Sequence, residues 1–137
     1  MPQADGEEHR APREVLIVDD DTDVRESLRD VLLDEGYSVA AASNGADALR
    51  QLESRPQPGI ILLDLMMPGM NGWGVLERLR GREATAQIPV AVISAQRGER
   101  PAGSDVVLEK PIRIERLLDV VATYCAAPDR EPDDGSR

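Results

Sequence analysis

Residues 60–64 read IILLD, an uninterrupted apolar run that ends in a carboxylate. Four more short runs share this character: VLIVD at 15–19, YSVAAA at 37–42, VAVIS at 90–94 and VVLE at 106–109. Continuous apolar runs, as opposed to alternating ones, are typical of strands that are covered on both faces. The five runs therefore predict five strands of a buried parallel sheet.

Helical patterns separate most of these runs, with apolar residues at spacings of three or four. Alternation of strand and helix implies right-handed crossovers and places the chain in the α/β class. Gly36 follows the first pattern, as expected of the residue just beyond a helix end. The four patterns are Val24, Leu28, Val31 and Leu32; Ala46, Leu49 and Leu52; Val75, Leu76 and Leu79; and Ile114, Leu117, Leu118, Val121 and Cys125.

The connection between the last two strands, residues 95–105, lacks such a pattern. It contains Gly98, Pro101 and Gly103 and shows no apolar periodicity. A parallel crossover of this length is usually helical. We predict instead a loop, or at most one helical turn.

The chain has 137 residues, the length of one ordinary domain, and a formal charge of −10. We expect residues 14–127 to form that domain, and residues 1–13 and 128–137, which are rich in Pro, Gly and charge, to be disordered tails. The acidic balance argues against a nucleic-acid binder and against a membrane-surface binder, because both need a basic patch.

Cys125 is the only cysteine and His9 the only histidine, which excludes an intramolecular disulfide and a metal site rich in His or Cys. No segment is apolar enough for a membrane span, and the polar N-terminus does not resemble a signal peptide. We therefore expect a cytoplasmic protein.

In an open parallel sheet, ligands bind beyond the carboxyl ends of the strands. The predicted strand ends bring Asp19 and Asp20, Asp64, Ser94 and Lys110 to this edge. Each alone has a structural explanation, such as a helix cap or a solvated charge, but several carboxylates at one edge repel each other unless a cation is present.

A calcium loop is excluded, since position six of the EF-hand spacing from Asp19 is Val24 and position twelve is Asp30. Mg²⁺ fits better, because it is typically held by one or two carboxylates and a phosphate. Asp64 would then be a nucleophile that accepts a phosphoryl group. Lys110, the only lysine among sixteen basic residues, would neutralise phosphoryl charge as a compact ammonium.

At these positions the sequence resembles the receiver domain of two-component response regulators. The matching segments are VLIVDDD (15–21), IILLDLMMPGMNGW (60–73), VAVISA (90–95) and LEKPI (108–112). The D-x-x-M-P-x-x-x-G string from Asp64 to Gly72 is the most specific of them. The resemblance covers roughly residues 14–126 and implies a flavodoxin-like, doubly wound five-stranded sheet in the order 2-1-3-4-5.

The resemblance implies that Asp64 takes its phosphoryl group from a sensor histidine kinase or a histidine-containing phosphotransfer protein. Mg²⁺ would be bound by Asp20, Asp64 and the backbone carbonyl of Met66, with Asp19 acting through water. The only enzymatic activities implied are self-phosphorylation from small phosphodonors and autodephosphorylation.

The resemblance further implies that Ser94 and Lys110 contact the phosphoryl oxygens and that the peptide bond before Pro111 is cis. Met66 and Gln96, two positions beyond Asp64 and Ser94, would tune the lifetime of the acyl phosphate.

The sequence also departs from the family pattern. The fourth helix of the family is shortened or replaced by a loop, Val107 stands where an aromatic switch residue is usual, and Ile112 replaces the usual Phe. Dimerisation through the usual output surface therefore does not carry over, and we expect a monomer or a weak dimer. We expect a signal in the loop at 95–104 instead.

We favour a stand-alone phosphorylatable receiver that signals to an unknown downstream protein. A pseudo-receiver, which binds proteins without control by phosphorylation, is an alternative that the short fourth crossover and Val107 support. A hydrolase that forms an aspartyl-phosphate is a third, although no insertion is long enough for a substrate cap.

Overall fold

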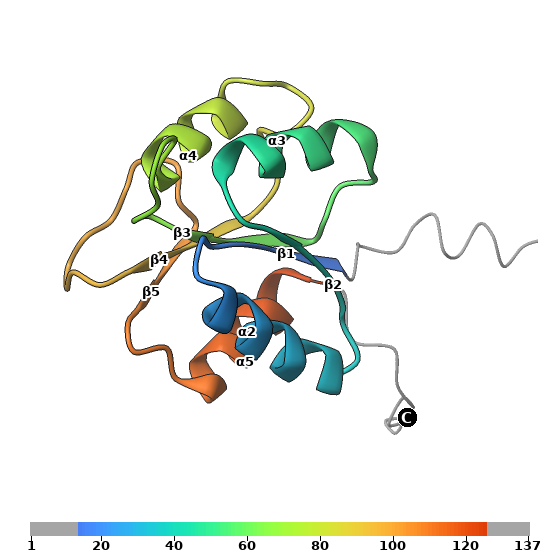
Figure 1. Cartoon of the computed structure of the whole chain (residues 1–137), viewed down its shortest axis with the longest axis vertical. Helices are drawn as coiled ribbons and strands as arrows, with labels where there is room; N and C mark the ends of the chain where they lie inside the picture. Colours follow the sequence, from blue (N-terminus) through green and yellow to red (C-terminus); the bar gives the residue numbers. More distant parts are fainter. Residues whose placement is uncertain (1–13, 126–137) are drawn as a thin grey trace, which may run out of the picture.

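Five parallel strands form one sheet in the order β2-β1-β3-β4-β5 in the computed structural model, which describes residues 14–125 (Figure 1). The predicted α/β fold and strand order are confirmed. The proposed tails, and the last two residues of the proposed 14–127 domain, lie outside the described residues. The strands are β1 (Glu14–Val18), β2 (Ser38–Ala42), β3 (Ile60–Asp64), β4 (Val90–Ser94) and β5 (Val106–Glu109).

Helices cover both faces of the sheet and make it a three-layer structure (Figure 1). Helices α2 (Thr22–Asp34) and α5 (Ile114–Tyr124) lie on one face, and α3 (Gly45–Ser54) and α4 (Gly72–Arg80) lie on the other. Each face has its own core, which is largely aliphatic. Strands β3 and β4 are buried along their whole length, which explains why their sequences are continuous rather than alternating.

Capping residues determine where the helices begin and end. The side chain of Asp21 accepts hydrogen bonds from the backbone N–H groups of Asp23 (2.9 Å) and Val24 (3.3 Å), and so caps α2. Such a cap stabilises a helix by about 1 kcal/mol. Gly36 follows the end of α2 with φ of 95°, as its position in the sequence predicts.

Two details of the helical patterns were wrong. Ala46 is exposed, because α3 begins at Gly45 and turns Ala48, with Leu49 and Leu52, toward the sheet. Ile114 is 46% exposed, because it begins α5 beyond the end of β5, where no strand covers it.

The connection between β4 and β5 contains no helix, so the predicted loop is confirmed. Arg80, the last residue of α4, holds its second half in place. Its guanidinium donates to the carbonyl of Gly103 (2.9 Å) and to the carboxylate of Asp105 (2.9 Å). That carboxylate also accepts from the backbone N–H of Val90 at 2.8 Å. The first half of the loop has no comparable anchor to α4 among the described residues.

None of the described helices is long and apolar enough to cross a membrane.

Gly72, the last residue of the motif that begins at Asp64, lets α4 start directly against β3. A Cβ atom at this position would lie 2.5 Å from the carbonyl oxygen of Asp64 and 2.6 Å from Cα of Leu65. Because both are backbone atoms, we expect Gly72→Ala to lower the free energy of unfolding by about 1–3 kcal/mol in urea denaturation.

Gly74→Ala, two residues along the same helix, is the matched control. A Cβ atom there would meet side-chain atoms alone: the flexible Met70 side chain at 3.2 Å and Oδ1 of Asn71 at an ordinary contact distance of 3.9 Å. Since alanine favours a helix over glycine by about 0.5–1 kcal/mol, we expect this variant to be as stable as the wild type or more stable. Equal losses in the two variants would show that the close approach at Gly72 does not matter.

Candidate functional site

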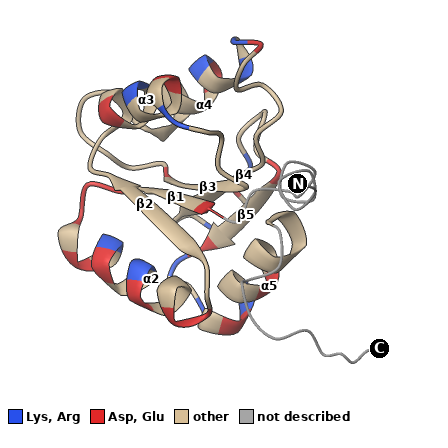
Figure 2. Cartoon of the chain, turned by 90° about the vertical axis from the view of Figure 1, so that its right-hand side faces the viewer, with Lys and Arg blue, Asp and Glu red and all other residues tan. Residues whose placement is uncertain are grey.

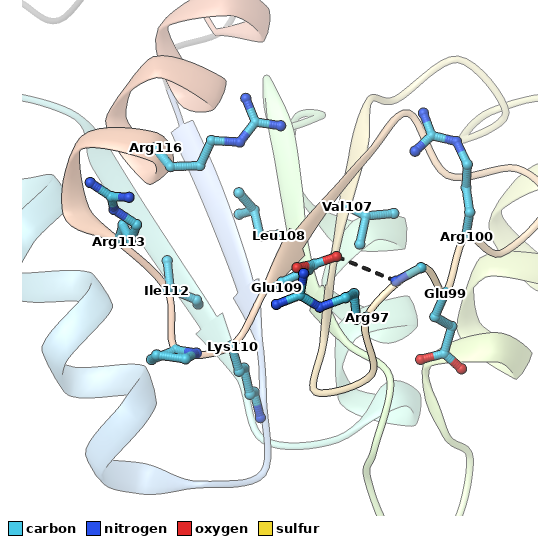
Figure 3. Close-up of a pocket in the computed structure, with 12 residues that line it drawn as sticks. Arg97, Glu99, Arg100, Val107, Leu108, Glu109, Lys110, Ile112, Arg113 and Arg116 are labelled. Atoms are coloured by element: carbon cyan, nitrogen blue, oxygen red, sulfur yellow. Dashed lines mark hydrogen bonds between the residues drawn. The ribbon is translucent and has the colours of Figure 1, made fainter.

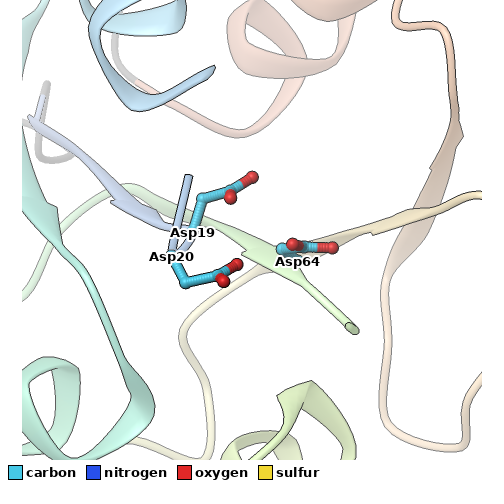
Figure 4. Close-up of side chains that lie close together, drawn as sticks. All are labelled: Asp19, Asp20 and Asp64. Atoms are coloured by element: carbon cyan, nitrogen blue, oxygen red, sulfur yellow. The ribbon is translucent and has the colours of Figure 1, made fainter. Parts of the chain in front are cut away.

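Three carboxylates meet at the carboxyl ends of the strands (Figure 4). Asp19, Asp20 and Asp64 each place an oxygen atom within 4.8 Å of the others. Asp19 and Asp64 are only 1% and 3% exposed, while Asp20 is exposed to solvent. The acidic part of the predicted site is therefore assembled as the sequence led us to expect.

The sheet register brings these residues together. Val18 pairs with Leu63 across β1 and β3, so the residues that follow them, Asp19 and Asp64, are neighbours. The backbone N–H of Asp19 also donates to the carbonyl of Ala42 on β2, at 3.1 Å. Backbone pairing with two strands thus fixes the position of Asp19, independently of the contacts of its side chain.

The carboxylate of Asp19 is buried with only one of its two oxygens hydrogen-bonded, which disfavours its ionised form. Its Oδ1 accepts from the backbone N–H of Asp21 at 2.9 Å, but its Oδ2 is buried and has no hydrogen-bond partner among the described residues. Burial, together with the nearby charges of Asp64 and Asp20, raises the pKa of Asp19 from 3.8 to about 6; the Asp21 hydrogen bond and Lys110 only partly offset the rise.

This arrangement fits a hard divalent cation. Mg²⁺ binds oxygen ligands and favours sites with one or two carboxylates. A buried carboxylate oxygen without a partner and three acidic groups in mutual repulsion are both stabilised by a cation in their midst. Asp19, Asp20 and Asp64 are therefore the residues that could hold such an ion.

Asp64 also faces the only lysine of the chain. The Nζ atom of Lys110 lies 3.6 Å from Oδ1 of Asp64, and the backbone N–H of Met66 donates to the same oxygen at 3.2 Å. Oδ2 of Asp64 accepts no hydrogen bond from a described residue, so this oxygen has no competing partner. The carboxylate is thus held at one oxygen and free at the other.

Lys110 reaches the site from the end of β5, and its backbone N–H donates to the carbonyl of Ser94 at 2.9 Å. The peptide bond between Lys110 and Pro111 is cis, as the resemblance implied. The structure thus brings Lys110 to Asp64 as predicted.

Ser94 stands at the same edge but bonds elsewhere. The residue is 1% exposed, and its hydroxyl donates to the carboxylate of Glu99 and lies 3.1 Å from the backbone carbonyl of Gln96. The backbone N–H of Gln96 donates to the Ser94 oxygen at 3.0 Å. The sequence placed Ser94 correctly but gave no sign of its bond to Glu99, a polar residue in a loop without periodicity.

The three proposed tuning positions lie around this edge. The side chain of Met66 is 70% exposed, and Gln96 is exposed as well. Val107 is half-buried and packs against the core beneath α3 and α4. Arg25 is a residue that the sequence did not indicate: its guanidinium donates to the backbone carbonyl of Asp19 at 2.8 Å and ties α2 to the acidic cluster.

Comparison with the sequences of known proteins identifies the family that the motifs resemble. A family model described as the response regulator receiver domain matches residues 15–122. The response regulator MprA of Mycobacterium sp. (strain KMS) is 38% identical over 130 residues, which are 89% of this chain and 55% of the relative. MprA of Mycobacterium tuberculosis (strain ATCC 25177 / H37Ra) is 42% identical over 110 residues, 76% of this chain and 46% of the relative. The chain thus spans about half the length of these curated relatives.

Solved structures show the same fold. A putative response regulator from Chloroflexus aurantiacus J-10-fl superposes with a TM-score of 0.75 at 31% identity, covering 82% of this chain and 97% of that one. The chemotaxis protein CheY4 of Vibrio cholerae superposes with a TM-score of 0.74 at 26% identity, covering 83% and 99%.

The raised pKa of Asp19 predicts how stability depends on pH. Because the folded-state pKa of about 6 lies above the ordinary 3.8, Asp19 contributes to stability below pH 4 and loses that contribution as the pH rises through 6. We expect Asp19→Asn to raise the free energy of unfolding by about 1–2 kcal/mol at pH 7.5 without divalent cations, a value that allows for screening by water at the open side of the site.

Urea denaturation between pH 4 and pH 7.5 measures this effect. Asp30→Asn, which removes an exposed carboxylate of α2, is the control and should leave the pH dependence as it is. If Asp19→Asn retained the wild-type pH dependence of stability, the Asp19 carboxylate would not be the group that causes it.

Proposed function

Because this chain belongs to the receiver domains of response regulators, we propose that it accepts a phosphoryl group on Asp64 as part of two-component signalling. One observation carries the proposal for this residue. Asp64 is the buried carboxylate that lies beside both the other two acids and the only lysine. No other described carboxylate forms an ion pair with Lys110.

The reaction we propose is an in-line transfer. An oxygen of the Asp64 carboxylate attacks phosphorus, the bond from phosphorus to the donor nitrogen or oxygen breaks, and its electron pair leaves with the donor. Oδ2 of Asp64 suits this role, since Oδ1 already bonds to the Met66 N–H and lies near Lys110. A carboxylate is ionised at neutral pH, so the step needs no general base.

The charges around Asp64 determine whether an anionic phosphoryl group can approach. Lys110 supplies one cation, 3.6 Å from Oδ1. We propose that Asp20, Asp64 and the backbone carbonyl of Met66 hold Mg²⁺, with Asp19 acting through water. When bound, the ion would supply positive charge that offsets the repulsion between these carboxylates and the phosphoryl oxygens. The partnerless Oδ2 of Asp19 supports this assignment.

Ser94 and Lys110 are the groups that we propose to contact the phosphoryl oxygens, both during transfer and after it. Both stand at the ends of neighbouring strands: Ser94 pairs with Glu109, and the backbone N–H of the next residue, Lys110, donates to the Ser94 carbonyl at 2.9 Å. A hydroxyl donor and an ammonium would stabilise the negative charge of the bound phosphoryl group. Met66 and Gln96, exposed on the loops beside the site, are proposed to tune the lifetime of the acyl phosphate.

The partners we propose follow from this chemistry. The donor is a sensor histidine kinase or a histidine-containing phosphotransfer protein, and small phosphodonors and autodephosphorylation are side activities of the same site. The output is a contact with a downstream protein, made by a cytoplasmic monomer or weak dimer. The charge of −10 supports a protein partner over nucleic acid or a membrane surface.

A pseudo-receiver is the second candidate function. Two observations favour it: no helix lies between β4 and β5, and Val107 stands at the position of the family's aromatic switch. In that case the fold would bind partners without control by phosphorylation.

Phosphorylation separates the two candidates. In Mg²⁺ and a small phosphodonor, we expect the intact mass of the wild type to increase by one phosphoryl group, and that of Asp64→Ala to stay the same. Chelation of Mg²⁺ should abolish the gain, because the carboxylates would then repel the donor. A wild type that never gains mass would favour the pseudo-receiver.

Lys110→Arg tests whether phosphorylation of Asp64 requires a compact cation at this position. The planar guanidinium is larger than an ammonium and prefers two parallel bonds, which a single carboxylate oxygen at 3.6 Å does not offer. We expect the rate of phosphorylation to fall by about tenfold or more, equivalent to about 1.4 kcal/mol. Arg113→Lys, an exchange of the same two residue types at an exposed position, should have no effect. An unchanged rate in Lys110→Arg would mean that charge alone suffices.

A further inference from the structure

The hydroxyl of Ser94 is already engaged before any phosphoryl group is present. It is buried, and it donates to Oε1 of Glu99, five residues further along the chain. A hydroxyl carries one hydrogen, so it can make one strong donated bond at a time. A bond to the carboxylate of Glu99 and a bond to a phosphoryl oxygen are therefore mutually exclusive.

Glu99 belongs to the first half of the loop between β4 and β5, where other anchors are weak. The backbone N–H of Glu99 lies 3.4 Å from the carbonyl of Gln96, and that of Gly98 lies 3.4 Å from the carboxylate of Glu109. The bond from Ser94 to Glu99 has an ionised acceptor, and such bonds are about twice as strong as neutral ones. It links Glu99 to the end of β4, where the backbone N–H of Gln96 also donates to the Ser94 oxygen at 3.0 Å.

We propose that Glu99 is a positioning residue, which holds the Ser94 hydroxyl away from the phosphoryl site until a phosphoryl group reaches Asp64, and that residues 95–100 are then released. The inference rests on the proposed function of Asp64. The event that couples the two is the transfer of one donated hydrogen bond from the Glu99 carboxylate to a phosphoryl oxygen.

Electrostatics favours the release of Glu99 once that transfer has occurred. The carboxylate then loses its donor in a half-buried position, which is costly for an ionised group. It also faces the added negative charge of the phosphoryl group on the other side of Ser94, and like charges repel. Turning into solvent relieves both costs.

Release would change a charged surface beside the loop. Arg97 and Arg100 on the loop face Arg113 and Arg116 at the start of α5 across a cavity of about 680 Å³ (Figure 3). None of these four guanidinium groups makes an ion pair or a side-chain hydrogen bond with a described residue. Movement of the loop would shift two of the four cations relative to the others.

Basic residues outnumber acidic ones in the lining of this cavity, which contains Lys110 and these four arginines with Glu99 and Glu109. Figure 2 shows acidic and basic residues interspersed on α2, α3 and α4. In the switch we propose, a rearrangement of positive charge takes the role of the aromatic rotation, which Val107 cannot perform. It needs neither a fourth-crossover helix nor a ring at that position.

Glu99→Gln is the direct test, because it retains an oxygen acceptor and removes the charge. We expect phosphorylation from a small phosphodonor in Mg²⁺ to be about three- to tenfold faster than in the wild type, since the Ser94 hydroxyl leaves a neutral acceptor more readily than an ionised one. Intact mass against time measures the rate. Glu115→Gln, which removes an exposed carboxylate from the first turn of α5, is the control.

Hydrogen exchange of the amides at 95–100 tests the anchor itself, without phosphorylation. Glu99→Gln should accelerate exchange in the resting protein by weakening this bond, and Ser94→Ala by removing it together with the Gln96 N–H bond to the Ser94 oxygen. The double variant should exchange like Ser94→Ala, because without the hydroxyl the charge of residue 99 no longer matters. Phosphorylated wild type should show the same acceleration.

The possible failures are distinct. A wild type that accepts no phosphoryl group overturns the proposed function of Asp64. A wild type that is phosphorylated but shows unchanged exchange at 95–100, or a Glu99→Gln rate equal to that of the wild type, overturns the role of Glu99 alone.

Discussion

The repulsion among three carboxylates at one edge of the sheet is the constraint on which the rest of the site depends. Asp19 and Asp64 are buried side by side at the ends of β1 and β3, and Asp20 adds a third charge within 4.8 Å. The pKa of Asp19, raised to about 6, shows that this arrangement costs free energy in the absence of a cation. Such a cost is tolerated where it serves binding or catalysis.

The fold supplies the rigidity that keeps these charges together. Both strands are buried and hydrogen-bonded on two sides, so the carboxylates cannot move apart without disrupting the sheet. Gly72 lets α4 start against the backbone of Asp64, which fixes the loop that carries Met66. Lys110 then brings the one ammonium of the chain to Asp64 from β5. The start of the β4–β5 loop, in contrast to its second half, has no anchor to α4 among the described residues.

Much of this could be predicted from the sequence, because it depends on local pattern. Continuous apolar runs gave the strands to within one residue, and the absence of periodicity at 95–105 gave the loop. The acidic cluster followed from the rule that parallel strands end at a common edge. Which residues of a helix face the sheet was harder to predict, because it depends on the exact residue at which the helix begins; Ala46 and Ile114 are exposed for this reason. The contact of Ser94 with Glu99 had no signal at all, since an irregular loop has no period that could indicate where a side chain points.

Proton release on Mg²⁺ binding is the measurement that tests the central claim most directly, namely that buried carboxylates in mutual repulsion form a cation site. Calorimetric titration with Mg²⁺ in buffers of different ionisation enthalpy counts the protons released. At pH 6, where Asp19 is about half protonated, the claim predicts the release of up to about half a proton per ion bound, falling to nearly none at pH 8. Binding with no proton release at pH 6, or no binding at either pH, would contradict it.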